Sequence, residues 1–237
     1  MRDKRIFTLL LLITMTIIVV GWGLWQHSYY QKMVLAEGPA SSLTTSKAAL
    51  PISKLSVNKQ RLEVESFIKH HSAKRGMDWI DPQGATHLVR AISNHCIACT
   101  SLLLKAGADA NFAPAPHMAP LLIATSAGEI ELVSMLLKHG ANPNLKFNGE
   151  NYTLLMDAAF EGNQKVVEQL LKYGALIDQQ DREGMSALHY ASREGFTKVV
   201  ELLIKKGADR HLTNLKEETP LGLARRYQHL AVIDLLD

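Results

Sequence analysis

Two cysteines and a neighbouring histidine are the residues best suited by type and spacing to do chemistry. Cys96 and Cys99 form a C-x-x-C motif directly after His95, where a helix is expected to begin. A helix dipole stabilises a thiolate at this position, so the pair could form a disulfide or exchange disulfides. Three interpretations stay open: a local structural disulfide, two reduced packing cysteines, and a thiol–disulfide redox pair. No thioredoxin-like strand pattern surrounds the motif.

The other signs of catalysis or metal binding are weak. Two cysteines and one histidine leave a zinc site short of ligands. The chain has ten histidines, and they are scattered, with one adjacent pair at His70 and His71. No G-x-S-x-G, no H-E-x-x-H and no phosphate-binding glycine loop occurs. We therefore expect a chain that is not an enzyme and holds no metal or cofactor.

The charge balance argues against nucleic acid as a partner. The 237 residues carry 26 Lys and Arg against 23 Asp and Glu, a net charge of +3, and 47% of them are hydrophobic. A nucleic-acid-binding surface needs a concentrated positive face, and none is evident here. The length and the hydrophobic fraction suit a globular chain of one or two domains.

The first residues are typical of a membrane anchor. Residues 6–25 are mostly aliphatic and carry no charge. As a helix, this run would span about 30 Å, the thickness of a bilayer core. Three basic residues precede it within residues 1–5, whereas only Lys32 follows it closely. The positive-inside rule predicts a single-pass signal anchor, with a cytoplasmic N-terminus and an exported remainder.

A cleaved signal peptide is the alternative, with Val34-Leu35-Ala36 as the cleavage site. The apolar run is longer than signal peptides usually have, and the site lies far beyond its end, which favours the uncleaved anchor. Either way the bulk of the chain is expected outside the cytoplasm, which for a bacterium means the periplasmic side of the inner membrane. Residues 36–51 are small and polar with two prolines, so residues 26–57 are expected to form a flexible tether.

A repeat of about 33 residues organises the chain from residue 81 onward. A helix-starting position recurs at intervals of 33, 34, 33 and 33 residues: Thr86, Ala119, Thr153, Ser186 and Thr219. Helix-ending glycines recur at intervals of 33, 34 and 33: Gly107, Gly140, Gly174 and Gly207. Two independent landmarks with one period indicate a solenoid of stacked units.

Each unit has the same order of parts: a turn, a short helix, a second helix and a terminating glycine. An alanine recurs in the first helix, where helices must approach closely: Ala91, Ala124, Ala158, Ala191 and Ala224. Leucine pairs recur in the second helix and should supply the stacked core: Leu102-Leu103, Leu136-Leu137, Leu170-Leu171, Leu202-Leu203 and Leu235-Leu236.

These units resemble the ankyrin repeat. Residues 219–224 read TPLGLA and residues 186–191 read SALHYA, close to the T-P-L-H-x-A signature, and residues 107–111 read GADAN. The resemblance implies an all-α ankyrin-repeat solenoid of about five helix–turn–helix units. It also implies that His189 hydrogen-bonds a neighbouring turn rather than a ligand. His87 and Leu154 depart from the signature, because each replaces its proline.

The expected boundaries follow the repeat. A capping helix region at 58–80 should cover the open end of the stack, because an uncovered repeat would expose apolar surface. An insertion near residues 146–151 should enlarge one turn. The five units are expected at residues 81–113, 114–147, 148–180, 181–213 and 214–237.

The resemblance places a binding surface on the turn tips and the outward side of each first helix, the concave face of such a stack. Aromatic, Met and Arg side chains are enriched in protein interfaces. Five apolar residues are expected to be exposed on this face: Met118, Tyr152, Phe160, Met185 and Tyr227. Four charged residues are expected to border them: Glu161, Arg193, Glu194 and Arg226. The alternative is that these side chains pack against neighbouring loops.

Together these patterns predict a monomeric, membrane-tethered module that binds a protein partner. Two roles fit: an immunity protein that neutralises a secreted toxin, and a scaffold for an envelope or oxidative-stress enzyme. A redox protein using Cys96 and Cys99 is the rival from another class, and a structural spacer is a third possibility.

Overall fold

The computed structural model describes residues 57–71, 77–81, 84–147, 149 and 151–237. The chain divides into two units, residues 1–48 and 49–237, and every described residue belongs to the second. The expected anchor at 6–25 and the tether up to residue 56 lie outside the described residues. Within the described ranges, no helix is both long and apolar enough to cross a bilayer.

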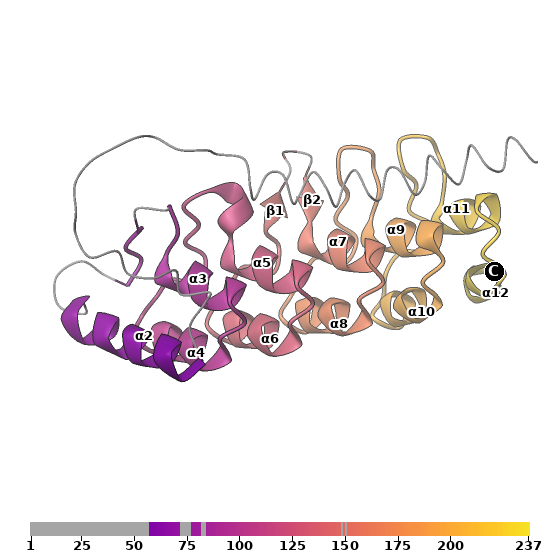
Figure 1. Cartoon of the computed structure of the whole chain (residues 1–237). Coiled ribbons are helices and arrows are strands. Elements are labelled where there is room, and N and C mark those ends of the chain that lie inside the picture. Colours follow the sequence, from indigo (N-terminus) through magenta and orange to yellow (C-terminus); the bar gives the residue numbers. More distant parts are fainter. Residues whose placement is uncertain (1–56, 72–76, 82–83, 148, 150) are drawn as a thin grey trace, which may run out of the picture. The chain divides into compact units, whose positions relative to one another are not determined.

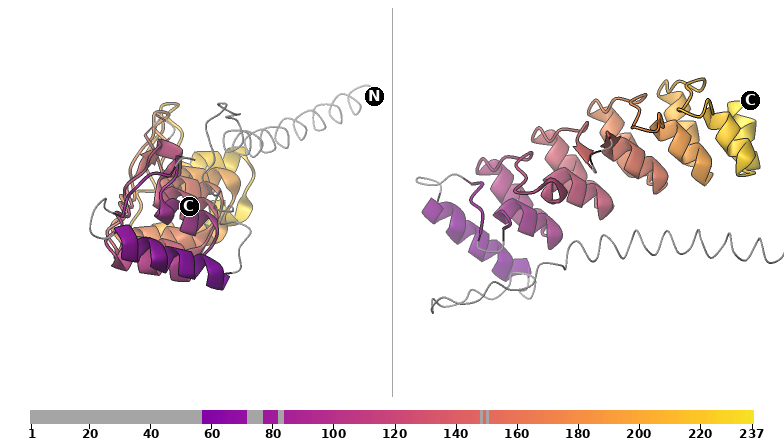
Figure 2. Two further views of the ribbon diagram at one scale, coloured as in Figure 1. Left: turned by 60° about the vertical axis from the view of Figure 1, so that its left-hand side comes forward. Right: turned by 90° about the horizontal axis from the view of Figure 1, so that it is seen from above.

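The described residues form successive helix pairs, preceded by one longer helix (Figure 1). First helices contact first helices and second helices contact second helices, so two rows form (Figures 1 and 2). The elements are α2 (Val57–His71), α3 (His87–Ser93), α4 (Ile97–Lys105), η2 (Pro116–Met118), α5 (Pro120–Ser126), α6 (Ile130–Lys138), β1 (Lys146–Phe147), β2 (Tyr152–Thr153), α7 (Leu154–Phe160), α8 (Gln164–Lys172), α9 (Ala187–Glu194), α10 (Thr197–Lys205), α11 (Pro220–Arg226) and α12 (Leu230–Leu236).

The recurring threonine starts the first helices. The hydroxyl oxygens of Thr86, Thr153 and Thr219 accept a hydrogen bond from the backbone N–H three residues later, at 3.1, 3.3 and 3.1 Å. Each bond satisfies an N–H that lacks a partner within the helix. Four of the second helices are followed, two residues after their last residue, by a glycine in the left-handed conformation. Glycine adopts this conformation more readily than other residues. The four glycines are Gly107, Gly140, Gly174 and Gly207.

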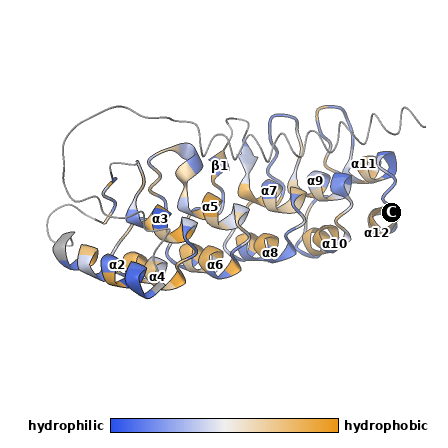
Figure 3. Cartoon of the chain, in the orientation of Figure 1, coloured by the Kyte–Doolittle hydropathy of each residue, from blue (hydrophilic) through white to orange (hydrophobic). Residues whose placement is uncertain are grey.

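The core contains buried hydrophobic residues from both rows of helices. Hydrophobic residues occur along the ribbons of both rows (Figure 3). The recurring alanines of the first helices are 0–5% exposed. One leucine of every second-helix pair is also at most 4% exposed: Leu103, Leu136, Leu170, Leu203 and Leu236. The predicted mostly helical ankyrin-like core is therefore confirmed for the described residues.

The long helix α2 packs on α4 beside the first helix pair. Val64 and Phe67 are 4% and 8% exposed and join the core. The Phe67 ring stacks on the His87 ring, with centroids 3.6 Å apart. His87 stands where the signature has proline, so this departure supplies a ring for the contact with α2.

The turns of neighbouring units are joined by side-chain hydrogen bonds. The Asn111 Nδ2 donates to the Gly140 carbonyl at 2.9 Å, and its Oδ1 accepts from the Asn142 N–H at 2.7 Å. Asn144 makes the same two bonds one unit later, at 3.1 and 2.8 Å. Each amide thereby spans two units and keeps successive turns in register.

The expected insertion forms a short hairpin. β1 and β2 pair antiparallel, with Lys146 opposite Thr153 and Phe147 opposite Tyr152. The Phe147 and Tyr152 rings meet edge to face at 5.3 Å. The hairpin therefore delivers Tyr152 to the start of α7.

Cys96 and Cys99 are joined by a disulfide in the structure. Both residues are 1% exposed and belong to the core of the stack. Cys96 is also the residue immediately before α4, so the bridge ties the first turn of that helix to its start. This is the first of the three arrangements that the sequence left open.

Candidate functional site

A second, smaller hydrophobic cluster adjoins the core of the stack, and Tyr152 packs against both. We call the surface formed by the turns and the adjoining sides of the first helices the turn face. We call the second hydrophobic cluster the aromatic cluster. Its residues lie on β2, α7, α9, α11 and the turn before α9, and they are Tyr152, Met156, Phe160, Met185, Tyr190 and Leu223. Tyr152 and Phe160 are half-buried, so part of the cluster reaches solvent.

Tyr190 is the centre of this cluster. Its ring meets the Tyr152 ring edge to face at 5.4 Å and the Phe160 ring at 6.2 Å. Edge-to-face pairs add about 0.5–1.5 kcal/mol beyond the burial of the rings. Tyr190 itself is 9% exposed. The three rings therefore form one contiguous aromatic surface across α7 and α9.

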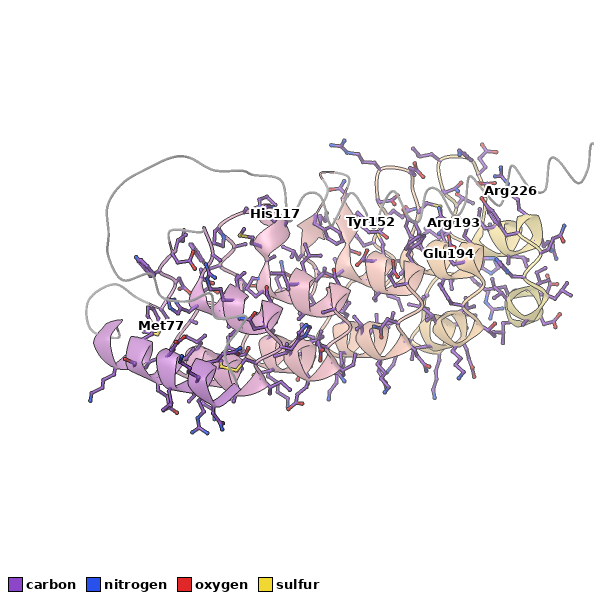
Figure 4. All side chains as sticks on the ribbon, in the orientation of Figure 1. Met77, His117, Tyr152, Arg193, Glu194 and Arg226 are labelled. Carbon is purple, nitrogen blue, oxygen red and sulfur yellow. A yellow bond between two sulfur atoms is a disulfide. The ribbon has the colours of Figure 1, made fainter. Side chains whose placement is uncertain are left out.

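Arg193 covers part of this aromatic surface. Its guanidinium lies 5.0 Å from the Tyr190 ring centroid and 5.5 Å from that of Phe160. Its Nε also donates to Glu194 at 2.8 Å. Tyr152, Arg193, Glu194 and Arg226 all lie on the turn side of the helices (Figure 4). The faces of the Tyr190 and Phe160 rings thus already accept a guanidinium, as expected for cation–π contacts.

Asp181 connects the aromatic cluster to the turn before α9. Its Oδ2 accepts a hydrogen bond from the Tyr190 hydroxyl at 2.6 Å. Its Oδ1 accepts from the Glu183 and Met185 N–H groups, both at 2.9 Å. Burial and the bond to Asp181 raise the pKa of Tyr190, so this phenol stays protonated. One carboxylate therefore fixes both the turn and the ring.

Asp157 is the carboxyl with the largest pKa shift on the turn face. Burial, and next the nearby charge of Glu161, raise its pKa from 3.8 to about 7. Among the described residues, no hydrogen bond or ion pair reaches its carboxylate oxygens. Charged groups without a partner are costly to bury, and such groups concentrate at functional sites.

The last unit forms a separate charged group. Arg226 donates to Glu218 at 2.6 Å, and Asn214 donates to the other Glu218 oxygen at 3.1 Å. The bond from Asn214, and then the Arg226 bond and charge, lower the pKa of Glu218. The Arg226 guanidinium lies 5.9 Å from the Tyr227 ring centroid, and Tyr227 is 49% exposed.

The structural histidine has the expected role. His189 is fully buried in α9, its Nδ1 lies 2.9 Å from the Ser186 hydroxyl, and its Nε2 lies 3.2 Å from the Glu218 carbonyl. Burial lowers the pKa of His189. Within the described part of the chain, no group of three His, Cys, Asp or Glu side chains is placed to hold a metal.

The structure brings together only part of the predicted surface. Tyr152, Phe160 and Arg193 lie in or on the aromatic cluster. Met185 was expected to be exposed, and this was wrong, because it is 3% exposed. It is a buried member of the aromatic cluster, and its sulfur lies 3.4 Å from the Asn214 Nδ2. Met118 lies in η2, outside the cluster.

The charged border has a mixed outcome. Glu161 and Glu194 are exposed, and Glu194 is held by Arg193. Arg226 and Tyr227 are exposed but belong to the last unit's own charged group. Predicted residues thus divide between two neighbouring parts of one face rather than forming one row.

Sequence reasoning missed a whole repeat position, the one four residues after each signature threonine. It holds Arg90, Ile123, Asp157, Tyr190 and Leu223. The residues that vary here face the turn side. Two of them, Asp157 and Tyr190, have the largest pKa shifts of the site. Aligning this variable position across units would have identified both.

A shallow hollow of about 500 Å³ lies elsewhere, between α6 and α8. It is lined by Ile130, Glu131, Ser134, Met135, Lys138 and Gln169. No aromatic ring lines it. The turn face is therefore the stronger candidate site.

Three relatives illustrate how widely the repeat occurs. A transient receptor potential cation channel subfamily A member 1 homologue of Caenorhabditis elegans is 35% identical over 111 residues, 47% of this chain and 9% of the relative. Protein glp-1 of the same species is 32% identical over 146 residues, 60% and 10% of the two chains. An ankyrin repeat and KH domain-containing protein of Caenorhabditis briggsae is 41% identical over 136 residues, 57% and 5%.

The similarity is confined to the repeats. This chain spans no more than 10% of the length of these three relatives. The family described as ankyrin repeats (3 copies) matches residues 112–181 and 155–236, more than half of the chain. These matches cover the helix pairs from α5 to α12, whose caps, alanines and leucines repeat with the same period. The chain belongs to the ankyrin-repeat family.

Proposed function

We propose that this chain binds a protein partner through the turn face of units 3–5, with the aromatic cluster at its centre, and catalyses no reaction. As an ankyrin-repeat protein, it is a protein–protein interaction module. The proposal adds which part of the repeat surface makes the contact, and it takes the chain to act as a monomer.

One observation carries the proposal: other units of the stack pack without an aromatic cluster at these positions. In unit 1 the equivalent positions hold Ala85 and Arg90, and in unit 2 they hold Met118 and Ile123, yet both units stack normally. Half-exposed rings that the fold does not need resemble the aromatic anchors of protein interfaces. The adjacent Arg193 is of a type enriched in the same surfaces.

We also propose that the chain is exported and tethered by residues 6–25. The uncharged apolar run and the basic residues before it support this arrangement. The disulfide between Cys96 and Cys99 supports it as well, because disulfides persist mainly in oxidising compartments.

An immunity protein against a secreted toxin is the specific role we favour. A rigid, anchored binder without catalysis could hold a toxin at the membrane. A scaffold for an envelope or oxidative-stress enzyme is the alternative, since it needs the same architecture. The redox alternative has less support, because both cysteines are 1% exposed and a thiol exchange partner must reach the sulfur.

A capture experiment tests the binding surface. The full chain, solubilised in detergent, serves as bait in native envelope extract beside a Tyr152→Ala/Phe160→Ala variant. We expect a protein retained by the parent and lost by the variant, because both rings leave the turn face. A toxin among the retained proteins would support the immunity role, and an envelope enzyme would support the scaffold.

The control is Tyr173→Ala. Tyr173 is also half-buried and aromatic, but it is the residue immediately after α8, in the row of second helices. All baits are compared by circular dichroism before use. Identical captures by the parent and the turn-face variant would contradict the proposed surface.

A further inference from the structure

The hollow between α6 and α8 contains a polar side chain at a position where every other unit has an apolar one. Gln169 is the sixth residue of α8, and it lines the hollow. The sixth residues of the other second helices are partly buried and pack against the core: Leu102, Met135, Leu202 and Leu235. Stacking of the repeat therefore favours an apolar residue here and does not explain a glutamine.

The amide of Gln169 is poorly satisfied by the fold. The residue is half-buried, its Oε1 is buried, and no described residue donates a hydrogen bond to that oxygen. A buried carbonyl oxygen without a donor lowers stability, and leucine at this position would avoid the loss. Rotation about the side-chain torsions of Gln169 turns the oxygen toward the hollow, where a donor from another molecule reaches it.

The other residues of the hollow combine apolar surface with balanced charge. Ile130 and Met135 of α6 are half-buried, and Ser134 adds a hydroxyl between them. Glu131 and Lys138 of the same helix are exposed and bring one negative and one positive charge. A charged occupant would be attracted by one of these and repelled by the other. The lining therefore fits a neutral polar group that is flanked by apolar atoms.

A primary amide is the neutral group that matches Gln169 best. It carries both a donor and an acceptor, so two amides can exchange two hydrogen bonds. The hollow is shallow and is lined by one helix and a single residue of the next. Small molecules bury most of their surface in a deeper pocket, whereas a protein segment makes its remaining contacts outside such a hollow.

We propose that the hollow between α6 and α8 is a second protein-binding surface, which takes an asparagine or glutamine side chain of a partner. The partner's amide pairs with the amide of Gln169, and apolar atoms beside it cover Ile130 and Met135. The hollow belongs to the row of second helices (Figure 1), so it is separate from the turn face. This inference does not depend on binding at the aromatic cluster.

Selection of random twelve-residue peptides displayed on phage tests this inference. The library is first depleted on a Gln169→Leu protein and then selected on the parent, both as full chains in detergent. Depletion removes peptides that bind elsewhere, the turn face included. We expect the surviving peptides to carry asparagine or glutamine beside apolar residues, because these lose hydrogen bonds when the Gln169 amide is replaced.

Isothermal titration calorimetry with synthetic copies of the survivors gives the size of the effect. Affinity should fall at least fivefold with Gln169→Leu and with Gln169→Met, whose unbranched side chain is close to glutamine in length. The matched control Gln164→Leu replaces an exposed glutamine at the start of the same helix and should change affinity less than twofold. Alanine in place of the peptide's amide residue should weaken binding to the parent but cause no further loss with Gln169→Leu.

Urea unfolding distinguishes a binding role of Gln169 from a structural one. We expect Gln169→Leu to be at least as stable as the parent, because the carbonyl oxygen without a donor is gone. A clearly less stable variant would assign Gln169 to the fold and overturn the inference.

The selection can also overturn the inference without affecting the proposed function. No surviving peptide, or survivors without an amide side chain, would contradict the proposed occupant. Survivors should bind the Tyr152→Ala/Phe160→Ala protein as tightly as the parent. A loss of binding there would place them on the turn face and count against the hollow.

Discussion

Units 1 and 4 each place an aspartate in the turn before the first helix, and each uses it differently. Asp81 accepts a hydrogen bond from the Ala85 N–H and forms an ion pair with Arg90. Asp181 caps its turn in the same way, but its other carboxylate oxygen accepts from the Tyr190 hydroxyl. The side chain nine residues later therefore decides whether the aspartate forms an ion pair or holds an aromatic ring.

The two turns also differ in how they meet the next unit. The unit 4 turn receives a hydrogen bond from the Leu215 N–H to the Glu183 carbonyl at 2.9 Å. A Cβ added at Gly184 would lie 2.8 Å from that same Leu215 nitrogen, whereas one added at Gly84 would meet no atom of a described residue within 4 Å. Units with the same backbone arrangement can therefore have turns that pack very differently against the next unit.

Removing the centre of the aromatic cluster should have the largest effect. We expect Tyr190→Ala to lower the free energy of unfolding by about 4 kcal/mol, because a buried ring and two edge-to-face contacts are lost. Urea unfolding followed by circular dichroism measures it. Ile123→Ala, at the same position of unit 2 and half-buried, should cost only about 1 kcal/mol. Equal losses would show that the cluster adds no stability of its own.

Alanine substitution of the turn glycines should have the next largest effect on stability, and the effect should differ between units 1 and 4. Gly184 and Gly84 both have positive φ, so alanine is strained at either site. We expect Gly184→Ala to cost about 3 kcal/mol, since backbone atoms must also move, and Gly84→Ala about 1 kcal/mol. Thermal unfolding of both variants checks the order. A larger loss of stability from Gly84→Ala than from Gly184→Ala would contradict the closer packing described for the unit 4 turn.

Asp157→Asn should stabilise the protein at alkaline pH. Burial raises the pKa of this carboxyl from 3.8 to about 7, so the unfolded chain ionises first as the pH rises. The parent therefore loses stability between about pH 4 and pH 7, and the loss is complete above pH 7. A shift of this size corresponds to at most about 4 kcal/mol. Because the side chain is only half-buried, we expect the variant to be about 2 kcal/mol more stable than the parent at pH 8 and equal to it at pH 4. A difference that does not change with pH would exclude this linkage.

The smallest expected effect is that of Tyr190→Phe. It removes only the 2.6 Å hydrogen bond to Asp181, and that carboxylate keeps its two bonds to the turn. A loss of about 1 kcal/mol is expected, together with unchanged partner capture. Urea unfolding of this variant beside Tyr190→Ala separates the contribution of the hydroxyl to stability from that of the ring. A Phe variant as unstable as the Ala variant would assign the effect to the hydrogen bond.

The cluster itself was only partly predictable. Tyr152 and Phe160 were accessible to alignment because they occupy turn and helix-end positions that a repeat does not bury. Tyr190 was not, because it follows the structural His189 within a signature that looks devoted to the core. Its role depends on Tyr152 and Asp181, which lie 38 and nine residues away in the sequence.

Met185 shows the opposite failure. Its position before the signature residue suggested exposure, as for Tyr152 one unit earlier. The Asp181 turn instead carries it under Tyr190 and beside Asn214 of the next unit. Whether a turn side chain is covered depends on the neighbouring unit, which a single repeat does not reveal.

The sequence by itself determined the period, the helix starts, the terminating glycines and the alanine and leucine core, because each rests on local backbone chemistry or on spacing within one unit. The tertiary structure alone decided which turn-face side chains meet, which carboxyl lacks a partner, and which methionine is buried. Those outcomes depend on contacts between neighbouring units, where the rotation of each side chain and the packing of the next turn determine burial and charge.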